Sequence, residues 1–357
     1  MNDRIKHWIR PEIQALSAYH VPDPGKLIKL DAMENPYHWP SELIEEWREL
    51  LLKAELNRYP DPGASALKKT LRKAMAVPPE MEIILGNGSD ELIQMIAMAM
   101  SGSERTILAP EPSFVMYKMI ATFVGMRYVG VPLQADFSLD MPAMLQAIEA
   151  AQPAIVFLSY PNNPTGNLFA KHDIESIIQA SPGLVVLDEA YHAFAGDSFM
   201  DRLGQFDNLV VMRTVSKMGL AGLRLGLLAG SHHWLSEFDK VRLPYNINVL
   251  TQLSAEFALS YHAVLMQQTT QICKDREKLL QSLSAIDGIT VYPSKANFIL
   301  LRLPTGRAVE IFEGLKQHGV LVKNLHGASP LLMDCLRVTV GTAEENRALI
   351  AALKDCL

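Results

Sequence analysis

Residues Thr214–Gly226 read TVSKMGLAGLRLG and join the end of an apolar run to a glycine-rich turn. Lys217 lies among small and apolar neighbours, where burial disfavours the ammonium form and leaves a nucleophilic amine. A lysine at a strand end is more often a solvated surface residue, so its surroundings matter. Thr214, Ser216 and Arg224 add two hydroxyls and a bidentate guanidinium, which suit a phosphate group. The stretch therefore predicts a site that holds a phosphorylated aldehyde on Lys217.

Short apolar runs alternate with helical patterns on both sides of this stretch. Several runs are apolar almost throughout, as strands covered on both faces are. This alternation predicts an α/β fold with a mostly parallel, seven-stranded sheet covered by helices. The expected strands are Glu82–Leu85, Thr106–Leu108, Arg127–Val131, Ala154–Leu158, Leu184–Leu187, Leu209–Thr214 and Leu225–Ala229. The helices expected between them include Asp90–Ser101, Phe114–Val124, Met141–Ala151 and Lys171–Ala180.

The pattern changes after about Pro244, and a smaller α+β domain is expected there. A long helical stretch is predicted from Asn248 to about Ala285, followed by a strand pair, a helix, two more strands and a final helix. We therefore predict an N-terminal segment at 1–30, a large domain at 31–247 and a small domain at 248–357.

Composition excludes several classes of protein. The net charge of −6 and the absence of a dense basic run argue against nucleic-acid binding. The apolar stretches are too short or too glycine-rich to cross a bilayer, and the N-terminus lacks the apolar core of a signal peptide. Three cysteines show neither a disulfide framework nor metal-ligand spacing, so no metal is expected. The small number of cysteines favours a location in the reducing cytoplasm.

A carboxylate follows another apolar run, in VVLDEAYHAF at Val185–Phe194. An aspartate after a strand usually caps a helix or serves a loop. Asp188 could instead pair with a protonated pyridine nitrogen and keep that ring able to accept electrons. Tyr191 could hydrogen-bond a phenolic oxygen on the same ring.

Two further segments follow strands and suit a ligand. YPNNPTG, at Tyr160–Gly166, is an ordinary turn by composition, but it lies where open α/β sheets bind ligands, and its Asn163 could donate to the phenolic oxygen. LGNGSDELI, at Leu85–Ile93, begins a helix whose first amides could cradle an anion. These amides belong to Gly88, Ser89 and Asp90, although Ser89 or Asp90 could simply cap the helix.

An aromatic residue lies between these two segments. Phe114, in PEPSF at Pro110–Phe114, could stack on the ring of a cofactor, although a phenylalanine is more often part of the core.

The order of these segments resembles the fold-type I pyridoxal-phosphate aminotransferases of the class I/II branch. It runs phosphate cradle, aromatic plate, Asn-Pro-Thr-Gly, Asp-x-x-Tyr, Ser-Lys and Gly-x-Arg. The resemblance covers nearly the whole chain. It implies pyridoxal 5'-phosphate as cofactor, with Lys217 as the catalytic residue that carries it and moves a proton at the substrate's α-carbon.

Within that branch the chain is most similar to the histidinol-phosphate aminotransferases. The segments that carry this similarity are Ile28–Tyr37, Asn57–Leu71, Leu85–Ile93, Tyr160–Gly166, Val185–Phe194, the turn around Lys323 and Cys335–Thr342. The resemblance implies that Tyr59 reaches the cofactor phosphate of a second subunit, so a homodimer is expected. It also implies that the substrate is held by Tyr19, Asn35, Asn163, Lys323 and Arg337.

Two positions depart from that family's pattern. Lys323 stands where an arginine is more usual, which keeps the positive charge but loses the bidentate fork. Met33 stands where the segment more often has an asparagine.

The resemblance implies transamination of L-histidinol phosphate with 2-oxoglutarate, giving glutamate, in histidine biosynthesis. An aromatic amino acid aminotransferase and a threonine-phosphate decarboxylase on the same fold stay open as alternatives. A non-catalytic ligand sensor is the third, although no DNA-binding extension accompanies it.

Overall fold

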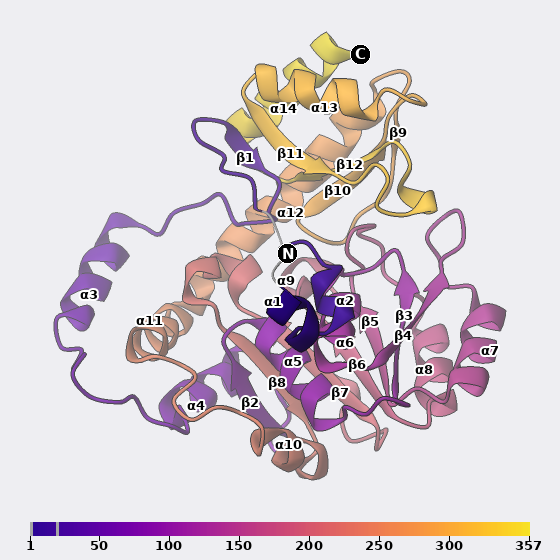
Figure 1. The fold of residues 1–357 in the computed structure, drawn as a ribbon. Coiled ribbons are helices and arrows are strands. Elements are labelled where there is room, and N and C mark those ends of the chain that lie inside the picture. Colours follow the sequence, from indigo (N-terminus) through magenta and orange to yellow (C-terminus); the bar gives the residue numbers. More distant parts are fainter. Residues whose placement is uncertain (1–2, 19–20) are drawn as a thin grey trace.

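The computed structural model describes residues 3–18 and 21–357, which form a large and a small sheet with their helices (Figure 1). The seven strands of the large sheet lie in the order β2-β8-β7-β6-β5-β3-β4. Strand β8 runs antiparallel to β2 and β7, and the other neighbouring pairs run parallel, so the predicted architecture is confirmed. The bounds are β2 (Glu82–Gly86), β3 (Thr106–Glu111), β4 (Arg127–Pro132), β5 (Ile155–Ser159), β6 (Leu184–Asp188), β7 (Leu209–Thr214) and β8 (Gly226–Gly230).

Helices cover both faces of this sheet. Along β6, Val185 and Leu187 pack into one core cluster, whereas Leu184 and Val186 pack into another on the opposite face. A strand buried on both faces has no polar side to alternate, which explains its continuous apolar sequence. The helices of this part of the chain are α3 (Ser41–Leu51), α4 (Ser65–Ala74), α5 (Ser89–Ala99), α6 (Met116–Val124), α7 (Met141–Ala151), α8 (Lys171–Ala180), α9 (His192–Ala195) and α10 (His232–Asp239), of which α3 and α9 pack against α11 (Val249–Ser260) and α12 (His262–Ser284) instead of the sheet. Three short 3₁₀ turns accompany them, at Met200–Arg202, Ser216–Met218 and Ala221–Leu223.

The small sheet has the order β1-β11-β12-β10-β9. Its first strand comes from the predicted N-terminal segment and pairs in parallel with β11, while the other pairs are antiparallel. The domain boundaries themselves stay a prediction. The strands are β1 (Ile28–Leu30), β9 (Thr290–Val291), β10 (Phe298–Arg302), β11 (Val320–Asn324) and β12 (Cys335–Thr339). Helix α13 (Ala308–Gln317) connects β10 to β11, and a 3₁₀ turn at Pro330–Leu332 lies between β11 and β12. Helix α14 (Ala343–Cys356) follows β12.

The long helical stretch predicted from Asn248 to about Ala285 is interrupted at Tyr261. Two helices occur instead, α11 (Val249–Ser260) and α12 (His262–Ser284). Tyr261 has φ −99° and ψ 34°, outside the helical region, and its hydroxyl donates to Glu46 of α3. The break lets α11 pack into the core of the large sheet while most of α12 packs against the small one. Periodicity alone does not reveal such a change of partner.

The first residues form two short helices, α1 (Asp3–Trp8) and α2 (Pro11–Gln14). Between them the guanidinium of Arg10 donates to the backbone oxygens of Thr122 and Phe123 at the end of α6. Within residues 3–18 and 21–357, helices of bilayer-spanning length and apolarity are absent.

Candidate active site

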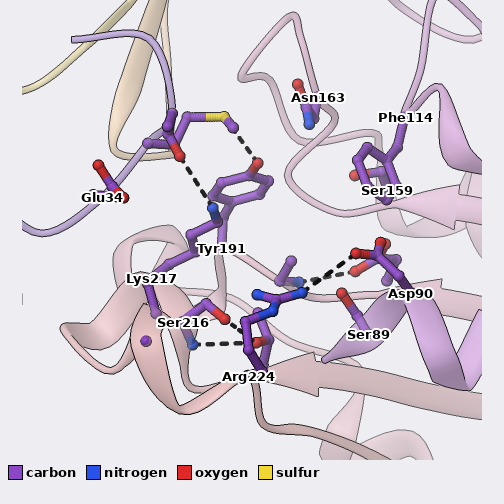
Figure 2. A pocket seen from close by; sticks show the side chains of 17 residues that line it. Glu34, Ser89, Asp90, Phe114, Ser159, Asn163, Tyr191, Ser216, Lys217 and Arg224 are labelled. Atoms are coloured by element: carbon purple, nitrogen blue, oxygen red, sulfur yellow. Dashed lines mark hydrogen bonds and ion pairs between the residues drawn. The ribbon is translucent and has the colours of Figure 1, made fainter. Parts of the chain in front are cut away.

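A cavity of about 390 Å³ lies at the carboxyl ends of β5, β6 and β7 (Figure 2). We call it the Lys217 cavity. Parallel strands end together at this edge, so residues distant in sequence meet there. Its lining residues are Ala32, Met33, Glu34, Ser89, Asp90, Phe114, Ser159, Asn163, Asp188, Ala190, Tyr191, Thr214, Ser216, Lys217, Ala221, Gly222 and Arg224.

Lys217 lies in the 3₁₀ turn that follows β7, and its amine points into the cavity (Figure 2). Its Nζ donates to the backbone oxygen of Ala32 at 3.3 Å. Burial, reinforced by the cation of Arg337, lowers the pKa of Lys217 to about 8, while Glu34 opposes this shift. A larger share of the amine is therefore neutral near physiological pH, as a nucleophile or a general base requires.

Asp188 ends β6 and lines the same cavity. Its carboxylate accepts from the hydroxyl of Tyr117 at 2.7 Å and from the backbone N–H of Ala190 at 3.1 Å. Burial raises the pKa of Asp188 to about 6, and the two groups that oppose this rise most are these neutral donors. A carboxylate that is desolvated in this way is stabilised by a cationic partner. A protonated pyridine nitrogen is such a partner, so Asp188 fits the cofactor that the resemblance implies.

The part of the cavity around Arg224 suits a phosphate. Arg224 reaches over the start of α5, and its Nη2 lies 3.4 Å from Asp90 Oδ2. Gly88 precedes that helix with φ +87°, and a Cβ there would lie 2.5 Å from Arg224 Nη2, so glycine permits this approach. The hydroxyls of Thr214 and Ser216 lie 2.8 Å apart beside it. Hydroxyls, helix amides and a guanidinium together match a phosphate dianion.

Three residues flank the space between the carboxylate and the phosphate end. Phe114 meets Tyr117 edge to face, with ring centroids 5.6 Å apart. The Tyr191 hydroxyl donates to the sulfur of Met33 at 3.1 Å, and Asn163 Oδ1 accepts from Arg337 Nη1 at 2.6 Å. These side chains could hold a flat ring between the two ends, as predicted for Phe114, Asn163 and Tyr191.

A second cavity, of about 480 Å³, adjoins the first and shares Met33, Phe114 and Asn163 with it. We call it the Arg337 cavity. Its lining residues are Met33, Glu111, Pro112, Ser113, Phe114, Val115, Lys118, Tyr128, Asn163, Pro164, Lys323, Asn324, Leu325, Ala328, Ser329, Leu332 and Arg337.

Two cations of the Arg337 cavity come from neighbouring strands. Lys323 of β11 and Arg337 of β12 are directly opposite each other in the antiparallel register, so their side chains share one face. Arg337 is buried, and its Nη2 donates to the backbone oxygen of Asp31 at 3.0 Å. A fixed guanidinium beside an ammonium favours a multiply charged anion.

Some predicted residues do not line either cavity. The amide of Asn35 donates to Gln268 and to the backbone of Met218. Gly88 contributes its backbone next to Arg224, as described above. Tyr59 is 80% exposed and stacks on Tyr245, outside both cavities. Tyr19 falls outside the described residues. No cluster of metal-ligating side chains occurs among the residues that the structure describes.

Sequence reasoning missed other residues of the site. Tyr117 supports Asp188 from within α6, where a lone tyrosine carries no local signal. Ser159 ends β5 directly before the Tyr160–Gly166 turn, and its position at a strand's carboxyl end could have indicated it. Glu34 lies beside Asn35 in a segment that the resemblance already covered.

Comparison with known proteins identifies the family. The model "Aminotransferase class I and II" matches residues 25–353. Histidinol-phosphate aminotransferase 2 of Nitrosococcus oceani is 60% identical over 99% of this chain and 98% of its own length. Histidinol-phosphate aminotransferase of Chromobacterium violaceum is 52% identical over 98% of both.

A solved structure shares the fold. Histidinol-phosphate aminotransferase from Sinorhizobium meliloti, in complex with pyridoxal-5'-phosphate, superposes with a TM-score of 0.87 at 24% identity, over 98% of this chain and 97% of that one. The chain therefore belongs to the class I and II aminotransferases and, within them, to the histidinol-phosphate aminotransferases.

Proposed function

We propose that this protein transfers the amino group of L-histidinol phosphate to 2-oxoglutarate, in a step of histidine biosynthesis that runs physiologically toward histidinol phosphate. Family membership supports the reaction type, at 60% identity to a histidinol-phosphate aminotransferase. The observation that carries the proposal is the pair of adjoining cavities. One holds a lysine with a pKa lowered to about 8, and the other holds Lys323 beside a buried Arg337.

The Lys217 cavity would bind pyridoxal 5'-phosphate. Arg224, Ser89, Thr214 and Ser216 would bind its phosphate, and Asp188 would accept a hydrogen bond from its protonated ring nitrogen. When bound, the cofactor supplies an electron sink that stabilises negative charge on the substrate's α-carbon. Phe114 would lie against the ring, while Tyr191 and Asn163 would bind its phenolic oxygen.

Lys217 would carry the cofactor through its amine and then move a proton. Its lowered pKa leaves a substantial fraction of the amine neutral, so it can take the proton from the substrate's α-carbon and return it at a neighbouring carbon. Its hydrogen bond to the backbone of Ala32 orients the amine within the cavity. A tethered base so placed avoids the entropic cost of recruiting one from solution.

The Arg337 cavity would hold the substrate phosphate. Histidinol phosphate carries a phosphate where ordinary amino acids carry an α-carboxylate, and two adjacent cations match its larger charge. Arg337 also donates to Asn163, which lines both cavities, so binding of the phosphate would be linked to the cofactor ring. The carboxylates of 2-oxoglutarate would use the same cations in the second half of the reaction.

A second subunit would complete the site. The protein would work in the cytoplasm. Tyr59 is exposed and stacked on Tyr245, with Leu56 and Leu243 also exposed nearby in sequence. Exposed apolar and aromatic side chains of this kind are typical of subunit interfaces. Tyr59 would then reach the cofactor phosphate of the partner. Sedimentation of the purified protein at the mass of a single chain would contradict this arrangement.

The test uses the visible absorption of the cofactor-loaded protein. L-Histidinol phosphate without a keto acid should abolish the visible absorption band of the cofactor bound to Lys217. Adding 2-oxoglutarate should restore this band while glutamate forms. A band that does not respond would overturn the substrate assignment and keep the cofactor. Phenylalanine, tyrosine and threonine phosphate would then be tried, and release of carbon dioxide would identify a decarboxylase. A protein with no band after cofactor addition would overturn the proposal as a whole.

A further inference from the structure

One acidic side chain lines the Arg337 cavity among the described residues, and the reaction outlined above does not use it. Glu111 ends β3, and the other charged residues around it are Lys118, Lys323 and Arg337. A carboxylate weakens the binding of a phosphate through like-charge repulsion unless a donor lies between them. Its presence therefore calls for a ligand group that carries an N–H or a positive charge.

Glu111 is held in place by its neighbours on β4. Its side chain lies against Gly130, where a Cβ would fall 2.3 Å from the carboxyl carbon. Only a residue without a side chain leaves this room. Tyr128 lies on the same strand, and burial followed by the Glu111 carboxylate raises the pKa of its hydroxyl. The Lys118 ammonium lies 5.7 Å from the Tyr128 ring centroid. The carboxylate is thus preoriented.

The amine, the phosphate and the imidazole ring of the substrate can each be assigned to a different part of the two cavities. In the proposed reaction the amine enters the Lys217 cavity at Phe114 and Asn163, which line both cavities. The phosphate takes the cations on β11 and β12. The other polar groups that line the cavity include Glu111 at the end of β3, Tyr128 of β4 and Lys118 of α6, and the remaining arm is the imidazole ring.

We propose that Glu111 accepts a hydrogen bond from the imidazole N–H of the substrate and so selects imidazole-bearing amino phosphates over those with a hydrocarbon ring. This inference rests on the proposed function. A phenyl ring offers no donor, so its binding desolvates the carboxylate and adds no hydrogen bond to the one that the Tyr128 hydroxyl supplies. Glu111 is thus a specificity residue that contacts the far end of the substrate rather than the reacting atoms.

The experiment compares two substrates that differ only in the ring, L-histidinol phosphate and L-phenylalaninol phosphate. The holoenzyme and its Glu111→Met and Glu111→Gln variants are assayed for kcat/KM with both, at saturating 2-oxoglutarate. Glu111→Met should lower kcat/KM for histidinol phosphate by about 10- to 100-fold and leave or raise the value for phenylalaninol phosphate. Glu111→Gln keeps an acceptor without the charge, so it should fall between Glu111→Met and the unaltered protein.

A second variant tests the placement of the carboxylate without changing it. Gly130→Ala should displace Glu111 and reduce the preference for histidinol phosphate in the same direction. Equal losses with both substrates, or no loss with either, would overturn the role of Glu111. If the unaltered holoenzyme does not turn over histidinol phosphate, the proposed function fails instead. Retained activity on phenylalaninol phosphate shows that a variant is folded.

Discussion

The two adjoining cavities are built in different ways. The Lys217 cavity draws most of its polar residues from the carboxyl ends of strands in one sheet, where Asp188, Thr214 and Ser159 each end a strand. The Arg337 cavity needs both sheets, because Glu111 comes from the large one and Lys323 and Arg337 from the small one. Chemistry therefore draws mainly on one sheet, whereas substrate choice depends on how two sheets meet.

The charges of the cavities differ as well. In the Lys217 cavity, burial moves an acid and a base toward neutrality, with pKa values of about 6 for Asp188 and about 8 for Lys217. The Arg337 cavity has an excess of cations among its lining residues. The first is prepared for proton transfer and the second for binding an anion. Substitutions should separate these two functions.

The largest effect is expected at Lys217. Lys217→Ala removes both the cofactor-binding amine and the proposed proton carrier, so kcat should fall by about 10⁴-fold or more. The phosphate end is untouched, so some cofactor binding should remain. Single-turnover assays with L-histidinol phosphate would measure the loss, and Lys240→Ala, an exposed lysine paired with Glu237, serves as control. Near-normal turnover would exclude the proposed mechanism.

The Lys217 cavity could be predicted largely from sequence because its motifs directly follow strands. Lys217, Asp188 and Asn163 come from three short segments, and the parallel sheet brings them together. Tyr117 escaped because it reaches Asp188 from a helix, without a local pattern.

Two other features of the structure could not be predicted from local sequence patterns. Glu111 ends a strand too, but its importance comes from Gly130 on the neighbouring strand and from the cations of the other sheet. The break at Tyr261 likewise reflects which sheet each helix packs against. Tertiary packing decides both, and periodicity does not record it.

The second-largest effect is expected at Arg337 and should act mainly on substrate binding. Arg337→Gln removes a buried guanidinium from the Arg337 cavity, which should lower kcat/KM for histidinol phosphate by about 10²- to 10³-fold. Arg337 also lowers the pKa of Lys217, so this variant should shift the amine's titration upward. Assays well above pH 8 therefore isolate the loss of phosphate binding. Cofactor affinity, measured by titration of the apoprotein, should change little, and a parallel loss would show that the cavities are not separable.

Asp188 should give the cofactor-free protein a pH-dependent stability. Its folded pKa of about 6 lies above the ordinary value of 3.8 for an aspartate, so folding favours the protonated acid. Its destabilising contribution is therefore full above about pH 6 and is lost as the pH falls toward 4. From this group alone, the free energy of unfolding should be about 1 kcal/mol lower at pH 8 than at pH 5.

Urea denaturation of the apoprotein at both pH values would measure this difference, and Asp188→Asn should remove that part of it. An identical pH dependence in the two proteins would show that Asp188 is not desolvated as the structure indicates.

A smaller effect should come from the cation opposite Arg337. Lys323→Arg restores a bidentate fork on the same face of the small sheet, so KM for histidinol phosphate should fall by about 3- to 10-fold. KM for phenylalanine, whose carboxylate carries less charge, should fall less. A rise in both values would indicate that the cavity is too narrow for the larger side chain. In that case lysine would occupy this position because the cavity has no room for arginine.

The smallest effect is expected at Met33, which lines both cavities. Its φ of +56° lies in the left-handed region, where asparagine is tolerated better than most residues. The conformation is fixed, because Met33 N donates to Thr339 Oγ1 at 2.9 Å and its backbone oxygen accepts from Asn297 at 2.9 Å. The usual asparagine would therefore relieve strain but lose the sulfur that accepts from Tyr191.

Met33→Ala loses the same side-chain contacts and keeps the strain. The free energy of unfolding of Met33→Asn should exceed that of Met33→Ala by about 0.5–1 kcal/mol. Equal stabilities would show that the backbone term is negligible there. If the Tyr191 contact matters more than strain, both variants should be less stable than the unaltered protein, because each loses the sulfur at the boundary of the two cavities.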